Sequence, residues 1–453
     1  MNTECTADQL TFQGFGRQEM VLTHDAEVST SDGGLVILHQ IEKRHRILAR
    51  LADCFQDNRH PSYTEHTVSH LLTQRIFGIC QGYEDLNDHD EWRKDPLLAL
   101  VCDKGDGEVL SGKSTLNRLE LGKEVAEEYG KRYNRITWDN DKIEDLFIDL
   151  FLESFDEVPK EIILDFDATD DPLHGEQEGR FFHGYYDKYC YLPLYVFSGQ
   201  HLICAQLRSS DIDASLGTVE VLQRVVPKIR DRYPEVHIIV RGDSGFCREQ
   251  IMAYCESVKI SYLFGLAKNS RLKRSIGKEL YQVEHRYNAS NEKQRLFKEL
   301  IYKTNTSWSR SRRVVAKVEY LHKGANPRFV VTNIPILKCP AKILYEELYC
   351  GRGDMENRIK EQQLYLFADR TSTGWMSSNQ LRLWFSSIAY TFFVWLRGKY
   401  LAGSEWTRSQ AATLRLKILK VSAMVKVTVR RIRIRLPAAY PYWDSWLRFA
   451  RAV

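Results

Sequence analysis

Two short apolar runs, each ending in aspartate, constrain the fold of this 453-residue chain more than any other feature. EIILDFDATDD begins at Glu161 and VHIIVRGDSGF begins at Val236, and both are rich in the β-branched residues that favour strands. Between them, YCYLPLYVFSGQHLICAQLR is also strand-like, while ASLGTVEVLQRVVPKIRDRY has the apolar spacing of an amphipathic helix. This alternation of strands and helices predicts a mixed α/β core.

The segments on either side of this core differ from it in pattern. Residues 1–155 are expected to be mainly helical, because apolar residues recur at helical spacing in GLVILHQIEKRHRILARLAD, TEHTVSHLLTQRIFGICQGYEDLND and DKIEDLFIDLFLESF. From about Asn269 to Pro340 the chain is polar and then strand-like, with a hairpin expected to turn at Lys323–Pro327. A helical segment is expected from Ala341 through Leu364, followed by the strongly apolar helix NQLRLWFSSIAYTFFVWLRGKY.

One motif suggests a nucleotide-binding loop, because Gly107 is followed after four residues by Gly112-Lys113-Ser114. A phosphate-binding loop leaves a buried strand directly and enters a helix. Here the nearest apolar run, Leu97–Val101, follows Asp95-Pro96 and is predicted to be helical, with aspartate as its N-cap. Ser111 or Ser114 can instead cap a helix over STLNRLELGKEVAEEYGKRY. The context therefore argues against an ATPase.

The acids that end the strands form a better candidate site. Asp165 and Asp167 lie two residues apart on one strand, so their side chains share a face, and Asp243 follows the second strand. Carboxylate oxygens at strand ends suit Mg²⁺, and two such ions can assist phosphoryl transfer. The alternative is that each aspartate only begins a turn or caps a helix.

A third segment, YCGRGDMENRIKEQQ, adds further polar side chains at helical spacing. A helix would align Tyr349, Arg352, Glu356 and Lys360 along one stripe. The glutamate could ligate metal, while the cations and the phenol could hold phosphate oxygens. Two glycines weaken the helix, and a solvated charged face remains the alternative for Lys360.

These motifs resemble those of the DDE transposases of bacterial insertion sequences, and most of all the insertion-sequence thirteen-eighty group. That group belongs to a class with a Tyr-x2-Arg-x3-Glu-x6-Lys signature. The resemblance is most specific from Ile162 to Thr371. It implies that the metal-binding acids are Asp167, which fits a D-x-T pattern that Asp165 does not, together with Asp243 and Glu356.

The same resemblance assigns the signature tyrosine and arginine to Tyr349 and Arg352. The signature lysine is missing, because its position holds Gln363. Lys360 lies one helical turn away and could take over its phosphate contact. Trp308 is a candidate counterpart of an insertion tryptophan that holds an extruded base in relatives, with hairpin packing as the alternative.

The resemblance also implies an α/β fold with a ribonuclease-H-like catalytic core, a β-rich insertion and a helical N-terminal DNA-binding region. The expected units are 1–155, the helical N-terminal DNA-binding region; 156–268, the first part of the catalytic core; 269–340, the β-rich insertion; 341–400, the second part of the core with the glutamate helix; and 401–453, a basic C-terminal region. Two Mg²⁺ ions, for which Mn²⁺ can substitute, are the implied cofactors. The implied partners are terminal inverted-repeat DNA and target DNA, held by a homodimer in a synaptic complex in the bacterial cytoplasm, at the nucleoid.

The C-terminal region is strongly basic and fits a polyanionic partner. From Leu396 to Val453 there are thirteen Lys and Arg residues and two acids. Arg431, Arg433 and Arg435 alternate with apolar residues, as on a half-buried strand that could bind successive phosphates, and the pair Arg430-Arg431 suggests a bulge. A solubilising strand face is the competing interpretation. No apolar stretch reaches the length of a membrane span, so no membrane partner is expected.

Two other functions remain open at this stage. The chain could be a DNA-binding protein of the same family whose catalytic site has decayed, with Gln363 as the first indication. The ATPase suggested by the Gly112-Lys113-Ser114 motif is the other, and the weaker, alternative.

Overall fold

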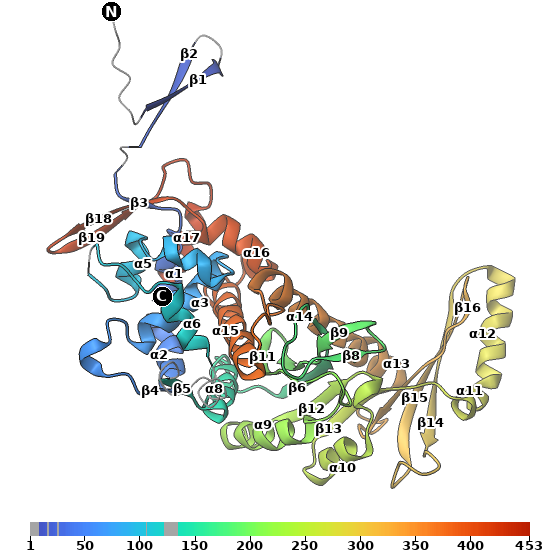
Figure 1. Cartoon of the computed structure of the whole chain (residues 1–453). Helices are drawn as coiled ribbons and strands as arrows, with labels where there is room; N and C mark the ends of the chain where they lie inside the picture. The colour runs from blue at the N-terminus through green and yellow to red at the C-terminus, as the bar shows by residue number, and fades with distance from the viewer. Residues whose placement is uncertain (1–8, 16–17, 25–26, 106, 122–134) are drawn as a thin grey trace, which may run out of the picture.

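A large mixed sheet forms the centre of the computed structural model, which describes residues 9–15, 18–24, 27–105, 107–121 and 135–453 (Figure 1). The strands lie in the order β11 (His201–Gln206), β10 (Leu194–Ser198), β6 (Glu161–Ala168), β12 (His237–Gly242), β13 (Ser261–Leu266), β17 (Arg328–Thr332), β15 (Arg312–Leu321) and β14 (Gln294–Tyr302), with β16 (Gly324–Ala325) beside β15. β6, β12 and β13 are parallel, and the other neighbours are antiparallel. The predicted mixed α/β fold is confirmed.

The two faces of β6 have different partners because successive side chains of a strand alternate. Leu164 and Phe166 are buried in one apolar cluster with the helices α9 (Thr218–Arg232) and α10 (Glu249–Ser257). Asp165 and Asp167 therefore lie on the other face. The helix α14 (Gly353–Leu366) packs against β6 as well.

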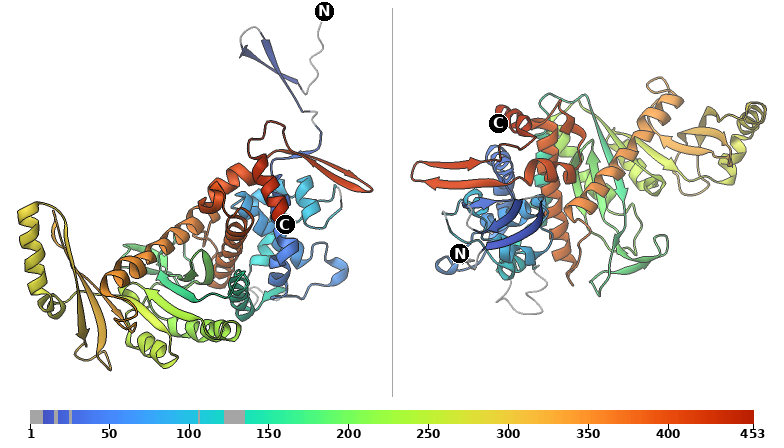
Figure 2. Two further views of the ribbon diagram at one scale, coloured as in Figure 1. Left: turned by 180° about the vertical axis from the view of Figure 1, so that it is seen from behind. Right: turned by 90° about the horizontal axis from the view of Figure 1, so that it is seen from above.

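The segment expected as a β-rich insertion begins with helices. α11 (Ser270–Ser275) and α12 (Gly277–Ser290) precede β14, and α12 lies along β15 at one end of the molecule (Figures 1 and 2). The predicted hairpin is present between β15 and β17. Its strands extend the central sheet through β13, so the sheet is continuous across the expected boundary.

The N-terminal part combines helices with short strands. Its elements are β1 (Gln9–Phe15), β2 (Gln18–Thr23), β3 (Ser29–Thr30), α1 (Leu35–His45), α2 (Ile47–Ala52), β4 (Phe55–Asp57), α3 (Val68–Gln81), α4 (His89–Trp92), α5 (Pro96–Val101), α6 (Lys113–Glu120), β5 (Ile136–Trp138) and α8 (Asn140–Leu152), with short 3-10 turns at Pro61–Tyr63 and Leu86–Asp88. Arg46, in the left-handed region at φ 53°, divides the first expected helix into α1 and α2.

The end of the chain packs on these N-terminal helices. The C-terminal elements are α15 (Met376–Trp395), a π-helical turn Leu396–Tyr400, a 3-10 turn Glu405–Arg408, α16 (Ala411–Leu414), a π-helical turn Arg415–Leu419, β18 (Ala423–Thr428), β19 (Arg431–Arg435) and α17 (Trp443–Ala452). One apolar cluster contains Leu35 from α1, Trp384 from α15 and Phe449 from α17. Figure 1 shows the C-terminus beside the N-terminal helices.

The Gly112-Lys113-Ser114 segment has the helical context that the sequence indicates. α5 is a helix, with Asp95 accepting hydrogen bonds from the Leu97 and Leu98 amides. Gly112, and not Ser111 or Ser114, is the N-cap of α6, which corrects the expected cap. The Lys113 amide donates to Asp90, and the Lys113 ammonium contacts Asn87. The expected helix beyond residue 121 lies outside the described residues.

The described ranges contain no helix that combines the length and the apolar character needed to cross a membrane. α15, the most apolar of the long helices, is instead buried inside the protein, with Leu381, Phe385 and Phe392 all inaccessible to solvent.

Candidate active site

The carboxyl ends of two parallel strands meet beside a cavity of about 540 Å³. Asp167 lies at the end of β6 and Asp243 directly after β12, and both line this cavity. The register pairs Gly242 with Phe166, so the residue after β12 reaches the level of Asp167. The Asp243 carboxylate also accepts a hydrogen bond from the Gly245 amide at 2.7 Å, which fixes its orientation.

A long helical segment brings the third acid to the same cavity. It consists of α13 (Ala341–Ile343), a π-helical turn Leu344–Tyr349, a 3-10 turn Cys350–Arg352 and α14. Arg352, Glu356, Lys360 and Gln363 all line the cavity. The structure therefore brings together acids that lie 189 positions apart in the sequence, from Asp167 to Glu356.

Arg352 lies between two of the acids. Its guanidinium is 3.6 Å from the Asp167 carboxylate and 3.1 Å from that of Glu356. Although burial alone would lower the pKa of Arg352, the surrounding acids Asp167, Asp243 and Glu356 raise it. This arginine is firmly cationic and bridges the carboxylates.

Asp167 is the most perturbed of the three acids. Burial raises its pKa to about 7, and the negative charges of Asp243 and Glu356 add to the rise, while Arg352 opposes it. When the pKa of a carboxyl group is raised in this way, a cation that binds nearby stabilises its ionised form. The electrostatics of the cavity are therefore suited to a cationic ligand.

Asp165 has a different role from Asp167, although both lie on one face of β6. The Asp165 carboxylate pairs with the Arg241 guanidinium at 2.5 and 2.7 Å, and both side chains are buried. Arg241 also donates a hydrogen bond to the Leu348 carbonyl, just before Tyr349. Asp165 thus helps to join the sheet to the helical segment and does not line the cavity.

Tyr349 lies behind the cavity and not in it. Its hydroxyl sits over Gly265 of β13, where an added Cβ would lie 2.6 Å from the phenolic oxygen. Burial raises the pKa of Tyr349, and the nearby Asp243 contributes to the rise. The tyrosine packs closely against the strand next to β12, so a glycine is needed at residue 265.

Lys360 and Gln363 lie on the same side of α14 but behave differently. Lys360 is exposed at the cavity and forms no salt bridge with any residue in the described part of the chain. The Gln363 amide donates a hydrogen bond to the Asp170 carbonyl at 3.1 Å. Gln363 therefore holds the loop after β6 against α14, at the position where the resemblance leads one to expect lysine.

The acids supply the donor chemistry for divalent cations but are not gathered as a ready coordination group. Within the ranges that the structure describes, no group of three or more His, Cys, Asp or Glu side chains could hold a metal ion as arranged. The Arg352 guanidinium occupies the space between Asp167 and Glu356. Hard oxygen donors around one cavity fit Mg²⁺. An ion held by both Asp167 and Glu356 would need Arg352 to turn aside.

Trp308 lies away from the cavity, in the apolar core. Its side chain is 4% exposed, packs edge-on against Tyr302 and lies beneath the Arg312 guanidinium. The indole has no exposed face on which a base could stack. This arrangement matches the packing alternative for Trp308.

The basic segment near the C-terminus forms a two-stranded ribbon of β18 and β19 (Figure 2). Arg431, Arg433 and Arg435 are all exposed. Lys426 pairs with Arg433 across the two strands, so its side chain lies on the same face of the ribbon. The opposite face carries Val425, Val427 and Ile434, which pack on the core. The expected bulge is wrong, because Thr428 pairs with Arg431 and Arg430 belongs to a two-residue turn.

The sequence interpretation did not identify three aromatic residues that line the cavity, His183, Tyr185 and Tyr186. They belong to the turn between β8 (Phe181–His183) and β9 (Lys188–Tyr191), which form a small sheet with β7 (Asp171–Pro172). The aromatic run FFHGYYDKY could have indicated an exposed hairpin, since its rings do not alternate with polar residues.

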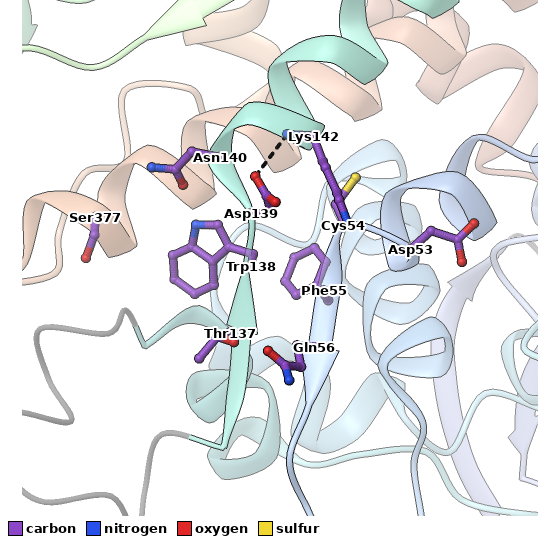
Figure 3. A pocket seen from close by; sticks show the side chains of 10 residues that line it. All are labelled: Asp53, Cys54, Phe55, Gln56, Thr137, Trp138, Asp139, Asn140, Lys142 and Ser377. Carbon is purple, nitrogen blue, oxygen red and sulfur yellow. Dashed lines mark hydrogen bonds between the residues drawn. The ribbon is translucent and has the colours of Figure 1, made fainter.

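A second large cavity, of about 650 Å³, lies at the ribbon formed by β4 and β5 (Figure 3). Two acids line it, Asp53 and Asp139. Asp139 accepts a hydrogen bond from the Lys142 amide and caps α8. None of the three predicted acids contributes to it, and neither does Arg352. The three predicted acids and Arg352 therefore line the first cavity and not this one.

The fold and the first cavity define a mixed α/β protein in which two carboxylates at the ends of adjacent parallel strands face a glutamate and an arginine from a helical segment. Residues 12–452 match the family described as Transposase DDE domain group 1. The chain belongs to this family and is a DDE transposase of a mobile element. The narrower thirteen-eighty group stays a prediction.

Comparison with solved structures found a similar chain in a piggyBac transposase synaptic complex with hairpin DNA, determined by cryo-electron microscopy. The two chains are 12% identical, the match covers 88% of this chain and 82% of that one, and the TM-score is 0.43. A comparison with curated proteins found no match.

Proposed function

We propose that this transposase cleaves the ends of its own insertion sequence and joins the freed 3′-OH to target DNA, with Asp167, Asp243 and Glu356 as catalytic acids. The observation that carries the proposal is that these acids, from β6, from the residue after β12 and from α14, line one cavity. The sheet order β11-β10-β6-β12-β13, with β6, β12 and β13 parallel, supports a ribonuclease-H-like core.

In this proposal the three acids would hold two Mg²⁺ ions, which supply an activated water and stabilise the leaving oxygen when bound. Arg352 would turn from Asp167 and Glu356 to a phosphate oxygen, a charge-assisted contact that planar guanidinium groups make well. Lys360 would hold a neighbouring phosphate, since it is exposed and lies one turn from Glu356. Tyr349 would keep the helical segment in place against Gly265.

The remaining parts of the proposal concern the DNA and the assembly. The exposed arginines of β19 would bind phosphates of the terminal inverted repeats or of the target without reading sequence. We also propose that the protein belongs to the thirteen-eighty group. It would act as a homodimer that pairs two element ends, at the nucleoid in the bacterial cytoplasm.

Replacing Asp243 by asparagine tests the catalytic assignment. Asparagine can still accept the hydrogen bond from the Gly245 amide, so the turn after β12 should be preserved. Asp243→Asn should bind DNA carrying the inverted repeats that bracket the reading frame, and should lose Mg²⁺-dependent cleavage by at least about a hundredfold. Gel shift and cleavage of end-labelled DNA measure the two properties.

The matched control is Asp231→Asn on the exposed face of α9, which should cleave like the wild type. Retained cleavage by purified Asp243→Asn protein would contradict the assignment. If the wild-type protein shifts the same DNA without breaking it, the chain is the decayed DNA-binding protein. The nucleotide-binding alternative loses its support, since Lys113 contacts Asn87 and Asp90 and follows no strand.

A further inference from the structure

The hairpin of β8 and β9 carries large aromatic side chains that the core does not use. Tyr185 is 85% exposed, Phe182 is 54% exposed, and Phe181 and Tyr189 are each 44% exposed. Burying rings of this size is strongly favourable, so several exposed rings on one short hairpin indicate a surface that another molecule covers.

The turn of this hairpin faces the acids. Tyr185 and Tyr186 line the same cavity as Asp167, Asp243 and Glu356. The pKa of Tyr186 is raised to about 12, first by burial and then by the nearby Asp170 and Asp167. The hairpin tip therefore lies at the edge of the candidate active site.

The rings are held in a defined arrangement. Tyr185 and Tyr186 meet edge to face, with centroids 5.0 Å apart, and His183 lies 4.9 Å from Tyr186. The His183 carbonyl accepts hydrogen bonds from the Tyr186 and Asp187 amides, which closes the turn. Tyr186 and His183 thus support Tyr185, whose ring remains open to solvent.

The chemistry of the cavity indicates what covers Tyr185. The ring face is apolar and offers a phosphate neither a hydrogen-bond donor nor a cation, so a charged backbone is a poor occupant of the ring face. A base has a flat uncharged face, and stacking on an aromatic side chain is sequence-tolerant. In a duplex this face is hidden by neighbouring bases, so only an unpaired nucleotide can offer it.

We infer that Tyr185, supported by Tyr186 and His183, is a stacking site for an unpaired base of the DNA strand whose phosphate enters the acidic cavity. This inference rests on the proposed function, because it takes the ligand to be the end of a DNA strand. It assigns base stacking to the β8–β9 hairpin, whereas Trp308 is buried in the core.

The site can be tested on the full chain without cleavage. The probe is a single-stranded oligothymidylate of about 16 nucleotides with one 2-aminopurine, whose fluorescence falls when it stacks, and the buffer contains EDTA. Wild-type protein should quench the probe. Tyr185→Ala should weaken binding by about fivefold or more and abolish the quenching, while Tyr185→Phe should retain both, because the ring makes the contact.

The matched control is Tyr281→Ala on α12, which removes an equally large ring that is 69% exposed but far from the cavity residues in sequence and outside its lining. It should bind and quench like the wild type. Unchanged binding and quenching by Tyr185→Ala would overturn the inference. A change in sedimentation behaviour by Tyr185→Ala, with normal quenching, would also overturn it and indicate that a second copy covers the ring.

The outcome separates this inference from the proposed function. If Asp243→Asn cleaves DNA like the wild type while Tyr185→Ala loses quenching, the catalytic assignment fails and the stacking site stands. If Asp243→Asn loses cleavage and Tyr185→Ala stacks normally, only the stacking site fails.

Discussion

Asp165 and Asp167 lie on the same face of one strand and differ in what each one contacts. Asp165 is buried against Arg241, whose guanidinium donates two hydrogen bonds to it. Burial raises the pKa of Asp165, and Arg241 opposes that rise. Asp167 faces the cavity beside other acids, and its pKa is about 7. The first carboxylate stabilises the fold, whereas the second is held in an electrostatically unfavourable place.

Asparagine substitutions should separate these two roles. Asp165→Asn leaves the Arg241 charge buried without a counter-charge, so the free energy of unfolding should fall by roughly 3 kcal/mol. Asp167→Asn removes a repelled carboxylate, so at pH 8 the free energy of unfolding should be unchanged or higher, while cleavage is lost. Urea unfolding and a cleavage assay measure both. Equal stability of Asp165→Asn and the wild type would contradict the structural role.

The sequence indicated the three acids, Arg352 and Lys360 at the cavity, but not the partners of these residues. The shared face of Asp165 and Asp167 follows from the two-residue period of a strand, and this was predicted. The choice between them depends on Arg241, a residue whose burial no local pattern reveals. The contact of Gln363 with the Asp170 carbonyl and the aromatic turn at Tyr185 likewise depend on tertiary packing.

At the scale of the element, α14 is held from behind by a buried ion pair. Glu361 follows Lys360 and accepts hydrogen bonds from Arg397 at 2.6 Å and from the Ala411 amide at 2.7 Å. Both charged side chains are 1% exposed. The helix that presents Glu356 to the cavity is thereby joined to the C-terminal elements.

The ribbon of β18 and β19 should contribute a charge-dependent part of DNA affinity. Replacing Arg431, Arg433 and Arg435 by glutamine should weaken binding to duplex DNA and reduce the slope of log affinity against log salt by about 3, because each phosphate contact contributes about 0.9. Fluorescence anisotropy at several salt concentrations gives the slope. An unchanged slope would show that these arginines only keep the surface soluble.

Elements with strong apolar periodicity were predicted well, and those without it were not. α3, α9 and α15 follow their apolar patterns. The segment of α12 was described only as polar, and no helix was predicted there. Among the described residues of α12 only Val283 is buried, so its sequence has almost no apolar stripe. The predicted bulge at Arg430 was wrong, because the alternation of side chains alone does not show whether a residue belongs to a strand or to the turn that precedes it.

At the scale of the whole molecule, buried histidines make the stability sensitive to acid. His89 is fully buried, and burial lowers its pKa from 6.5 to about 3, with the charge of Arg75 adding to the effect and Glu120 and Asp90 opposing it. Between these values the unfolded chain binds a proton that the folded chain does not. The stability that neutral His89 provides is therefore complete above pH 6.5 and declines as the pH falls toward 3.

Replacing His89 by glutamine should weaken this dependence. At pH 5 the wild type should lose at most about 2 kcal/mol of unfolding free energy through this residue. The difference in Tm between pH 7 and pH 5 should accordingly be smaller for His89→Gln. The control is His285→Gln on the exposed side of α12, which should follow the wild type. An identical pH dependence of all three proteins would contradict the assignment.

One apolar cluster joins parts of the chain on both sides of residues 155 and 401. Leu35, Trp384 and Phe449 belong to one apolar cluster, so the N-terminal helices share their interior with the end of the chain. Sequence patterns show which face of a helix is apolar, but not which distant helix covers that face. The sequence therefore predicts element types but not how distant elements pack together.

The shared cluster also affects how the protein can be made. A ribosome releases the N-terminal helices long before α15 and α17 are synthesised, and until then Leu38, Leu71 and Phe77 lack the part of their cluster that these C-terminal helices supply. The early part of the nascent chain must stay unaggregated while roughly three hundred more residues are added, at some 5–20 residues per second. A product that stops before α15 would therefore expose these apolar faces, and proteolysis should remove it.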